Sequence, residues 1–246
     1  MKKFCRGLYI WIERFTRFRA SVLACSASEQ EMAVKDVHYI KERALLWHNS
    51  VPDTLRERGK PVTLDFPYAC YIGRPCYQKN TLFLLDVIKK LKDTDCNLKF
   101  VLLGVGYHSP ELETMRRKIT ELDLADKILL MPWISHADCQ EYVRSSLFYI
   151  TTSLYEGLPL SVIEAMANGK PIIASNVVGN KDCVKDGVNG WLLPLDVKVF
   201  TDKIINLIAD KCLQKEMGTK SRQIFLNEFF IKKQIGLLQK IYEDNS

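Results

Sequence analysis

Two glutamates lie on either side of a predicted helix start. Glu156 comes before Pro159, and Glu164 lies about one turn inside the helix that begins near Pro159. The first turn of a helix offers free backbone N–H groups and the positive end of the helix dipole, so it binds anions. Glu164 is within reach of ligand hydroxyls such as those of a ribose, and Glu156 can meet the other end of the same ligand. These residues predict a site for an anion that also carries hydroxyls.

Two cations and a glycine-containing turn add to this chemistry. Arg74 and Lys79 follow an apolar run that ends near Ile72, and residues 104–106 (Gly-Val-Gly) follow the next such run. Arginine binds phosphate oxygens in pairs, and lysine adds a compact positive charge. If a diphosphate leaves as an anion, such groups stabilise the charge that develops in the transition state. The residue types therefore predict a phosphorylated ligand.

Short apolar runs alternate with helical patterns from about residue 66 onward. This alternation predicts parallel strands with right-handed crossovers, an open α/β sheet. Ligands bind outside the carboxyl ends of the strands in such sheets, and the loops that carry the candidate residues follow strands. The predicted strands are 66–72, 98–103, 127–130, 147–151, 171–174 and 190–193, and the helices between them are 80–92, 110–123, 136–145 and 160–168.

Local signals predict where two of these helices begin or end. Ser109-Pro110-Glu111 predicts an N-cap at Ser109, followed by proline in the first turn and an acid near the helix start. Asn168-Gly169 predicts the end of the helix that carries Glu164. Ser161 and Glu164 also have the spacing of a capping box, which is a purely structural interpretation of Glu164.

The remaining segments flank the alternating unit. Residues rich in prolines and polar side chains after position 50 predict a linker. Further helices are predicted at 7–19, 28–37, 197–209, 212–228 and 231–243, and short strands at 21–25 and 44–47. The predicted parts are 1–50, the end of another domain; 51–64, the linker; 65–230, the ligand-binding domain; and 231–246, a C-terminal helix.

Several stretches of this sequence resemble one known family. Residues 156–167 (EGLPLSVIEAMA) look like the E-x7-E signature of retaining glycosyltransferase family 4, which has the GT-B fold. Residues 169–174 and 186–190 are similar to the family's continuation of that signature. Residues 71–80 resemble its GR…KG segment, and residues 104–106 its GxG loop. The resemblance covers roughly 65–230 and implies a Rossmann-like, GT-B C-terminal domain.

The resemblance implies a donor site for a nucleotide-diphosphosugar, a UDP-, GDP- or ADP-sugar. Glu156 is then the catalytic residue that contacts the donor sugar, and Arg74 and Lys79 hold the diphosphate. Glu164 holds the ribose, and the backbone at Ile134 reads the base. The other donor-binding residues implied are Gly104 in its loop and, around the phosphates, Gly157, Leu158, Pro159 and Leu160. No cofactor and no metal is implied, because the cations and the helix terminus do the metal's work.

The family's acceptor side is mostly the N-terminal domain, and only its closing elements resemble residues 8–49. Residues 25–29 are similar to the family's VSxxE turn. Two function classes stay open. One is the donor half of a hexosyltransferase that acts with retention on a glycan or lipid-linked acceptor. The other is a non-catalytic nucleotide-sugar-binding module that needs a separate acceptor-domain subunit. A GT-B epimerase or phosphorylase is a third, weaker interpretation.

Other chemistries find little support in the residue patterns. Residues 104–106 lack the third glycine of a dinucleotide fingerprint, so NAD binding is not expected. Residues 93–95 spell D-x-D, but they fall between a helix and the next strand, at the amino edge of the sheet, and predict a turn. The four histidines, His38, His48, His108 and His136, show no metal-ligand spacing.

Composition and charge limit the compartment and the partners. The 246 residues have a net charge of +6, which suits anionic ligands, and no basic tract with interleaved aromatics predicts nucleic acid. The eight cysteines form no C-x-x-C pair, which is typical of a reducing cytoplasm. No run approaches the roughly 20 apolar residues that span a bilayer. Residues 1–19 predict a basic amphipathic helix for peripheral contact with the cytoplasmic membrane face, or for packing on protein.

Overall fold

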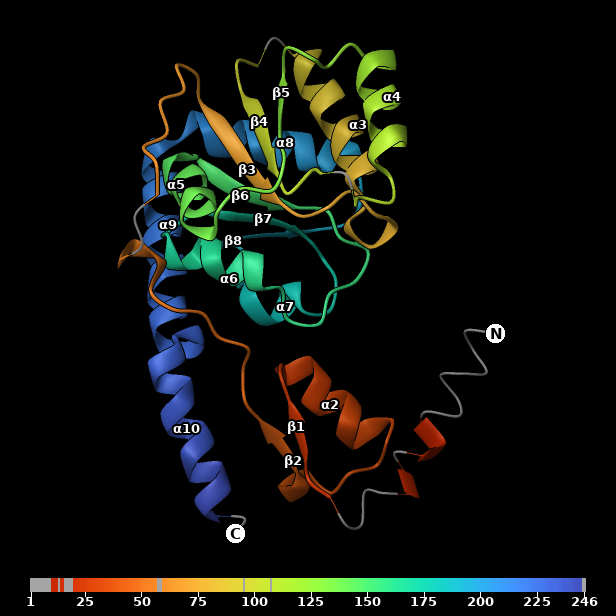
Figure 1. The fold of residues 1–246 in the computed structure, drawn as a ribbon, viewed down its shortest axis with the longest axis vertical. Helices are drawn as coiled ribbons and strands as arrows, with labels where there is room; N and C mark the ends of the chain where they lie inside the picture. Colours follow the sequence, from red (N-terminus) through yellow and green to blue (C-terminus); the bar gives the residue numbers. More distant parts are fainter. Residues whose placement is uncertain are drawn as a thin grey trace.

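The computed structural model describes residues 10–12, 14–15, 20–56, 59–94, 96–106 and 108–244. Its centre is one sheet of six parallel strands in the order β5-β4-β3-β6-β7-β8 (Figure 1). The strands are β3 (Tyr68–Ile72), β4 (Lys99–Leu103), β5 (Ile128–Met131), β6 (Phe148–Thr151), β7 (Ile172–Ser175) and β8 (Gly190–Leu193). The predicted open α/β, Rossmann-like sheet is confirmed, and each strand lies within two residues of its predicted bounds.

The order of the strands has a functional consequence. From β3 the chain moves outward through β4 to β5, then returns to pair β6 with β3 and moves outward on the other side through β7 to β8. The direction of winding therefore reverses between β3 and β6. In open α/β sheets, ligands bind in the crevice outside the carboxyl ends of the strands at such a reversal. The loops after β3 and β6 carry Lys79 and Glu156.

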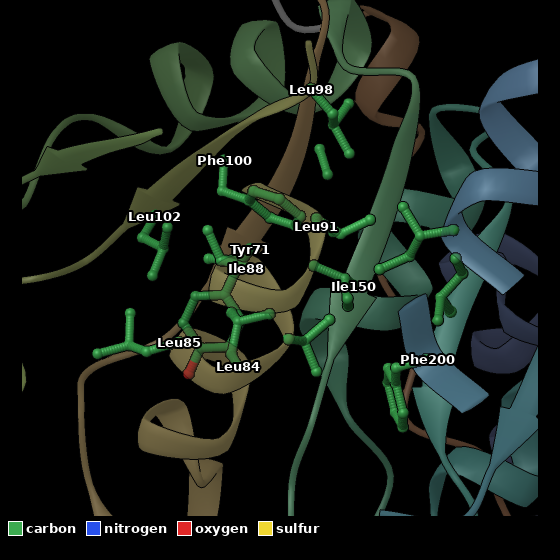
Figure 2. Packing of buried hydrophobic residues seen from close by; sticks show 14 of the residues in the cluster. Tyr71, Leu84, Leu85, Ile88, Leu91, Leu98, Phe100, Leu102, Ile150 and Phe200 are labelled. Atoms are coloured by element: carbon green, nitrogen blue, oxygen red, sulfur yellow. The ribbon is translucent and has the colours of Figure 1, made fainter. Parts of the chain in front are cut away.

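Helices cover both faces of the sheet, as parallel strands require. They are α3 (Thr81–Lys92), α4 (Leu112–Glu121), α5 (His136–Ser145), α6 (Leu160–Ala167), α7 (Asn180–Cys183), α8 (Val197–Ala209) and α9 (Lys211–Ile224). Side chains alternate along β3: Ala69 and Tyr71 join the cluster under α3, α4 and α8, whereas Tyr68 and Cys70 join the cluster under α5 and α6. Figure 2 shows Tyr71 and Phe100 packing against α3 in the first cluster.

The start of α4 differs from its prediction. Ser109 is not the N-cap, because the helix begins at Leu112 after Glu111, which makes no side-chain cap. The Ser109 hydroxyl instead accepts a hydrogen bond from the Gly106 amide, at 3.3 Å. Ser109 therefore closes the loop after β4, and the first turn of α4 lies two residues further on than the cap signal indicated.

The end of α6 is the one that the sequence predicts. Asn168 is the C-cap, and Gly169 follows with a φ of +67°. The Gly169 amide donates to Met166 and the Lys170 amide donates to Ala165, which is the hydrogen-bond pattern of a Schellman motif. This motif fixes α6 as a helix of two turns between two tight loops.

The C-terminal helices cross from the sheet to the N-terminal segment (Figure 1). A π-helix, Phe225–Phe229, follows α9 and replaces the end of the α-helix predicted at 212–228. It leads into α10 (Ile231–Asp244), which runs beside a small unit of β1 (Val22–Ala24), α2 (Ala27–Lys35) and β2 (Ala44–Leu46). The Trp47 indole donates to the Gln234 carbonyl at 2.9 Å and ties the two together.

The predicted N-terminal helix lies mostly outside the described residues. Residues 10–12 and 14–15 are helical, and the rest of 7–19 is not described. Arg14 donates to the Asp36 carbonyl at 2.7 Å, so this short piece touches the end of α2. Within the described residues, no helix has the length and apolar character needed to cross a bilayer.

Candidate functional site

The loop after β6 and the start of α6 form the centre of the site. Pro159 is the N-cap of α6 and makes no side-chain cap, and its carbonyl accepts from the Val162 and Ile163 amides, so the Leu160 and Ser161 amides are the ones that no cap satisfies. Such amides and the helix dipole attract an anion. Leu158 is 5% exposed and packs in the core, and its carbonyl accepts from Asn49 Nδ2 at 3.4 Å.

Glu156 is held by three donors on the loops at the winding reversal. Lys79 Nζ lies 2.7 Å from Glu156 Oε1, and Ser153 Oγ lies 2.6 Å from the same oxygen. Gln78 Nε2 donates to Glu156 Oε2 at 3.3 Å. Only 7% of the Glu156 side chain is exposed, so it is not a solvated loop acid. Gln78 and Ser153 were not predicted as site residues, although both lie in loops that follow predicted strands.

Because Lys79 contacts Glu156, Lys79 and Arg74 have different roles in the site. Lys79 pairs with Glu156, whereas Arg74 is exposed and forms no ion pair with any residue that the structure describes. Arg74 lines the neighbouring cavity, and Lys79 is not among the lining residues. The arginine is therefore the cation whose donors are available to a ligand, and the lysine holds Glu156 in position.

Glu164 is bound from the side by α5. Its Oε1 lies 3.0 Å from His136 Nε2, and its Oε2 accepts from Gln140 Nε2 at 3.2 Å. The capping-box interpretation of Glu164 is wrong, because α6 begins at Leu160, which places Ser161 inside the helix rather than at its cap. The carboxylate is thus free of any capping role and faces the polar side chains of α5.

A cavity of about 440 Å³ opens at the carboxyl ends of β3, β4 and β5. Most of its wall is apolar or backbone, and its charged or ionisable side chains are those of Arg74, His136 and Cys139. A Cβ at Gly106 would lie 2.8 Å from Trp133 Cδ1, so glycine allows the indole to pack closely there. The lining residues are Ile72, Gly73, Arg74, Gly104, Trp133, Ile134, His136 and Cys139.

Burial and charge shape the polar groups around this cavity. Burial, and after it the negative charge of Glu164, raise the pKa of the Cys139 thiol to about 11. The thiol is therefore neutral at physiological pH and acts as part of the apolar wall. His136 connects this wall to Glu164, because it both lines the cavity and contacts the carboxylate.

The structure brings the predicted residues together at one edge of the sheet. Arg74, Gly104 and Ile134 line the cavity, and Glu164 meets it through His136. On the other side of the α6 start, Glu156 and Lys79 form their pair, and the backbone between the two groups is that of Gly157, Leu158, Pro159 and Leu160.

The D-x-D stretch lies elsewhere. Asp93 and Thr94 form a turn after α3, at the amino edge of the sheet, as predicted, and Asp95 is outside the described residues. Lys89 pairs with Asp93 at 2.7 Å. Across the residues that the structure describes, no three His, Cys, Asp or Glu side chains gather into a group that could hold a metal ion.

Comparison with known proteins identifies the family. The model of the glycosyl transferases group 1 family matches residues 54–224, most of the chain. The chain therefore belongs to the glycosyl transferases group 1. This agrees with the resemblance that residues 156–167 indicate.

Two relatives illustrate the range of the similarity. UDP-Gal:alpha-D-GlcNAc-diphosphoundecaprenol alpha-1,3-galactosyltransferase of Escherichia coli is 26% identical over 99% of this chain and 65% of its own length. An uncharacterised glycosyltransferase of Haemophilus influenzae is 34% identical over 70% of this chain and 48% of its own length. The chain thus spans about half to two thirds of these relatives.

Solved structures share the fold. Sucrose-phosphate synthase of Thermosynechococcus elongatus superposes with a TM-score of 0.83 at 20% identity, over 97% of this chain and 61% of that one. The Anabaena protein HepE, in complex with UDP and glucose, gives a TM-score of 0.78 at 18% identity, over 91% of this chain and 63% of that one. These likenesses establish the GT-B type of Rossmann-like fold.

Proposed function

We propose that this chain is the donor-binding part of a retaining hexosyltransferase, of the family 4 type, that uses a nucleotide-diphosphosugar. One observation supports the proposal most strongly: two acids and an arginine with available donors lie around the start of a single helix, α6. Glu156 and Glu164 lie on either side of the α6 amides, and Arg74 stands in the wall of the adjoining cavity. A diphosphate bound at these amides can thus carry a base in the cavity on one side and a sugar beside Glu156 on the other.

This arrangement determines the direction in which the nucleotide-diphosphosugar lies in the site. The base enters the apolar cavity against Trp133 and Ile134, and the ribose hydroxyls donate to Glu164. The diphosphate takes the α6 amides and Arg74, which is suited to bidentate contact with phosphate oxygens. The sugar then lies at Glu156. Residues 65–230 form the donor-binding domain in this proposal, and no metal is required for binding.

The transfer itself breaks the bond between the anomeric carbon and the diphosphate oxygen. An acceptor hydroxyl supplies the new bond to that carbon, the nucleoside diphosphate leaves with the electron pair, and the hydroxyl proton passes to an oxygen of the departing diphosphate. Arg74 and the helix dipole stabilise the charge that grows on the leaving group. Lys79, 2.7 Å from Glu156 Oε1, holds this carboxyl group in position beside the sugar.

A uridine nucleotide and a glycan or lipid-linked acceptor are the substrates we propose. The name of the Escherichia coli relative gives UDP-Gal as donor and a diphosphoundecaprenol-linked sugar as acceptor. A structural neighbour, TarM of S. aureus, was solved in complex with fondaparinux, alpha-GlcNAc-glycerol and UDP. These names support the choice of UDP as the first probe.

Calorimetric titration with UDP, GDP and ADP tests the proposal. We expect saturable binding of one of these nucleotides, weakened about tenfold or more in Arg74→Ala and Glu164→Ala, since each removes a hydrogen bond to a charged group. Arg117 and Glu121 form an exposed pair on α4 and supply matched controls, Arg117→Ala and Glu121→Ala, that should bind normally. Absence of binding by the folded wild-type chain, or equal losses in the controls, would refute the donor site.

A further inference from the structure

A polar ladder joins α5 to α6 directly behind Glu164. On α5, His136 and Gln140 are one helical turn apart, and on α6, Glu164 and Asn168 are one turn apart. Residues four apart share one face of a helix, so the two pairs meet side by side. Asn168 Nδ2 donates to Gln140 Oε1 at 2.6 Å, and Gln140 Nε2 donates to Glu164 Oε2 at 3.2 Å.

Gln140 is the buried centre of this ladder. Its side chain has no exposed surface, whereas His136 is half exposed at the cavity wall. The orientation of the Gln140 amide is determined by its neighbours. Its oxygen faces the Asn168 amide nitrogen and its nitrogen faces the Glu164 carboxylate, and the reversed amide would set nitrogen against nitrogen and oxygen against oxygen.

We propose that Gln140 is a positioning residue for the ribose of the donor, acting through Glu164. This inference rests on the proposed function, in which Glu164 accepts hydrogen bonds from the ribose hydroxyls. Gln140 binds Oε2 and His136 contacts Oε1, so both oxygens of the carboxylate are oriented before any ligand arrives. A glutamate left without these partners must be ordered during binding, and the cost of that ordering lowers affinity.

Asn168 is part of the ladder because its side chain makes two hydrogen bonds. Asn168 Nδ2 donates to the Glu164 carbonyl at 3.0 Å as well as to Gln140, and the residue ends α6 as its C-cap. Asn168, at the end of α6, therefore orients Gln140, and Gln140 in turn orients Glu164 in the middle of the same helix. Loss of the Gln140 amide leaves Asn168 with its backbone partner but removes the donor to Glu164 Oε2.

The variant Gln140→Met tests this role, since methionine keeps the length and most of the volume but none of the contacts of the amide with Asn168, Glu164 and His136. Its affinity is measured by calorimetry for UDP and for 2′,3′-dideoxy-UDP, which lacks the ribose hydroxyls. We expect the Kd for UDP to rise about tenfold, a loss of about 1.4 kcal/mol, and the Kd for the dideoxy nucleotide to stay unchanged. In a Glu164→Gln background, Gln140→Met should have little further effect on UDP, because the two side chains act as one unit.

Controls separate positioning from general damage. Gln214 on α9 donates to the Leu207 carbonyl at 2.7 Å, away from the site, so Gln214→Met is the same substitution with no expected effect on either nucleotide. If Gln140→Met does not fold, Gln140→Asn keeps an amide on a shorter side chain and should show the same selective loss.

The outcomes distinguish this inference from the function on which it rests. If Gln140→Met loses affinity equally for UDP and the dideoxy nucleotide, or for neither, the role of Gln140 is overturned. The donor site itself still stands in that case, provided that the wild-type chain binds UDP. Failure of the wild-type chain to bind UDP, GDP or ADP would refute the donor site and this inference together.

Discussion

The substitution Gly179→Ala should disturb the donor site indirectly, by displacing the loop that carries Glu156 and Gly157. Gly179 is the N-cap of α7 and has a φ of +85°. A Cβ at this position would lie 2.3 Å from the Gly157 carbonyl oxygen and 2.9 Å from the Glu156 carbonyl carbon. Those atoms are backbone, which cannot rotate away as a side chain can. The loop that carries Glu156 and Gly157 must therefore move when the methyl group is added.

The size of the effect follows from two separable terms. An alanine in the left-handed region costs about 1–2 kcal/mol. Overpacking against fixed backbone adds about 1–3 kcal/mol. Gly187 supplies the matched control, because its φ is +73° and no described atom lies within 4 Å of the Cβ that Gly187→Ala would add. The control should show the first term alone.

The assays are urea denaturation and titration with UDP on the same samples. We expect both variants to lose stability, with Gly179→Ala losing at least about 1 kcal/mol more. Only Gly179→Ala should bind UDP about tenfold more weakly, since only this variant displaces the loop at the α6 start. Equal stability losses together with unchanged UDP binding in both variants would refute the claim that the α7 cap supports the site.

Three further predictions concern the rest of the chain. Leu84 is fully buried in the cluster under α3, so Leu84→Ala should lower the free energy of unfolding by about 3 kcal/mol in urea; a loss below about 1 kcal/mol would contradict the packing. The Arg222 hydrogen bonds to Asp53 hold the pKa of that carboxyl below its usual range, so the pair stabilises the fold above about pH 4 and loses this effect as pH falls further. Arg222→Ala should therefore show a shallower fall of the urea midpoint between pH 5 and pH 3, which lie about one unit above and below the ordinary pKa of an aspartate, and an unchanged slope would contradict this. Among the described cysteines, exposed Cys212 should react with a thiol reagent before Cys70, whose pKa is raised by burial, and peptide mapping that finds the reverse order would refute the assignment of burial.

The strands and most helices could be predicted from the sequence because local patterns determine them. Six apolar runs separated by helical patterns allow few arrangements once parallel pairing is assumed. The α6 end was readable for the same reason, since Asn168-Gly169 carries its own signal. The α4 start was not, because Ser109 uses its hydroxyl on the loop rather than on the helix.

The candidate site was predictable in position but not in its contacts. Glu156 and Glu164 could be singled out from their place after a strand and around a helix start. Their partners come from distant segments: Lys79 meets Glu156 from across 77 residues of chain, and Gln140 meets Glu164 from another helix. A lone glutamine in an amphipathic helix carries no signal that it is buried, so only the packing of α5 on α6 identifies it.

A crystal structure of the chain with bound UDP is the decisive test of the proposed donor site. We expect the base in the cavity beside Trp133, the ribose hydroxyls on Glu164, and the diphosphate between Arg74 and the first amides of α6. UDP bound at any other place, or bound here with its ribose turned away from Glu164, would contradict it.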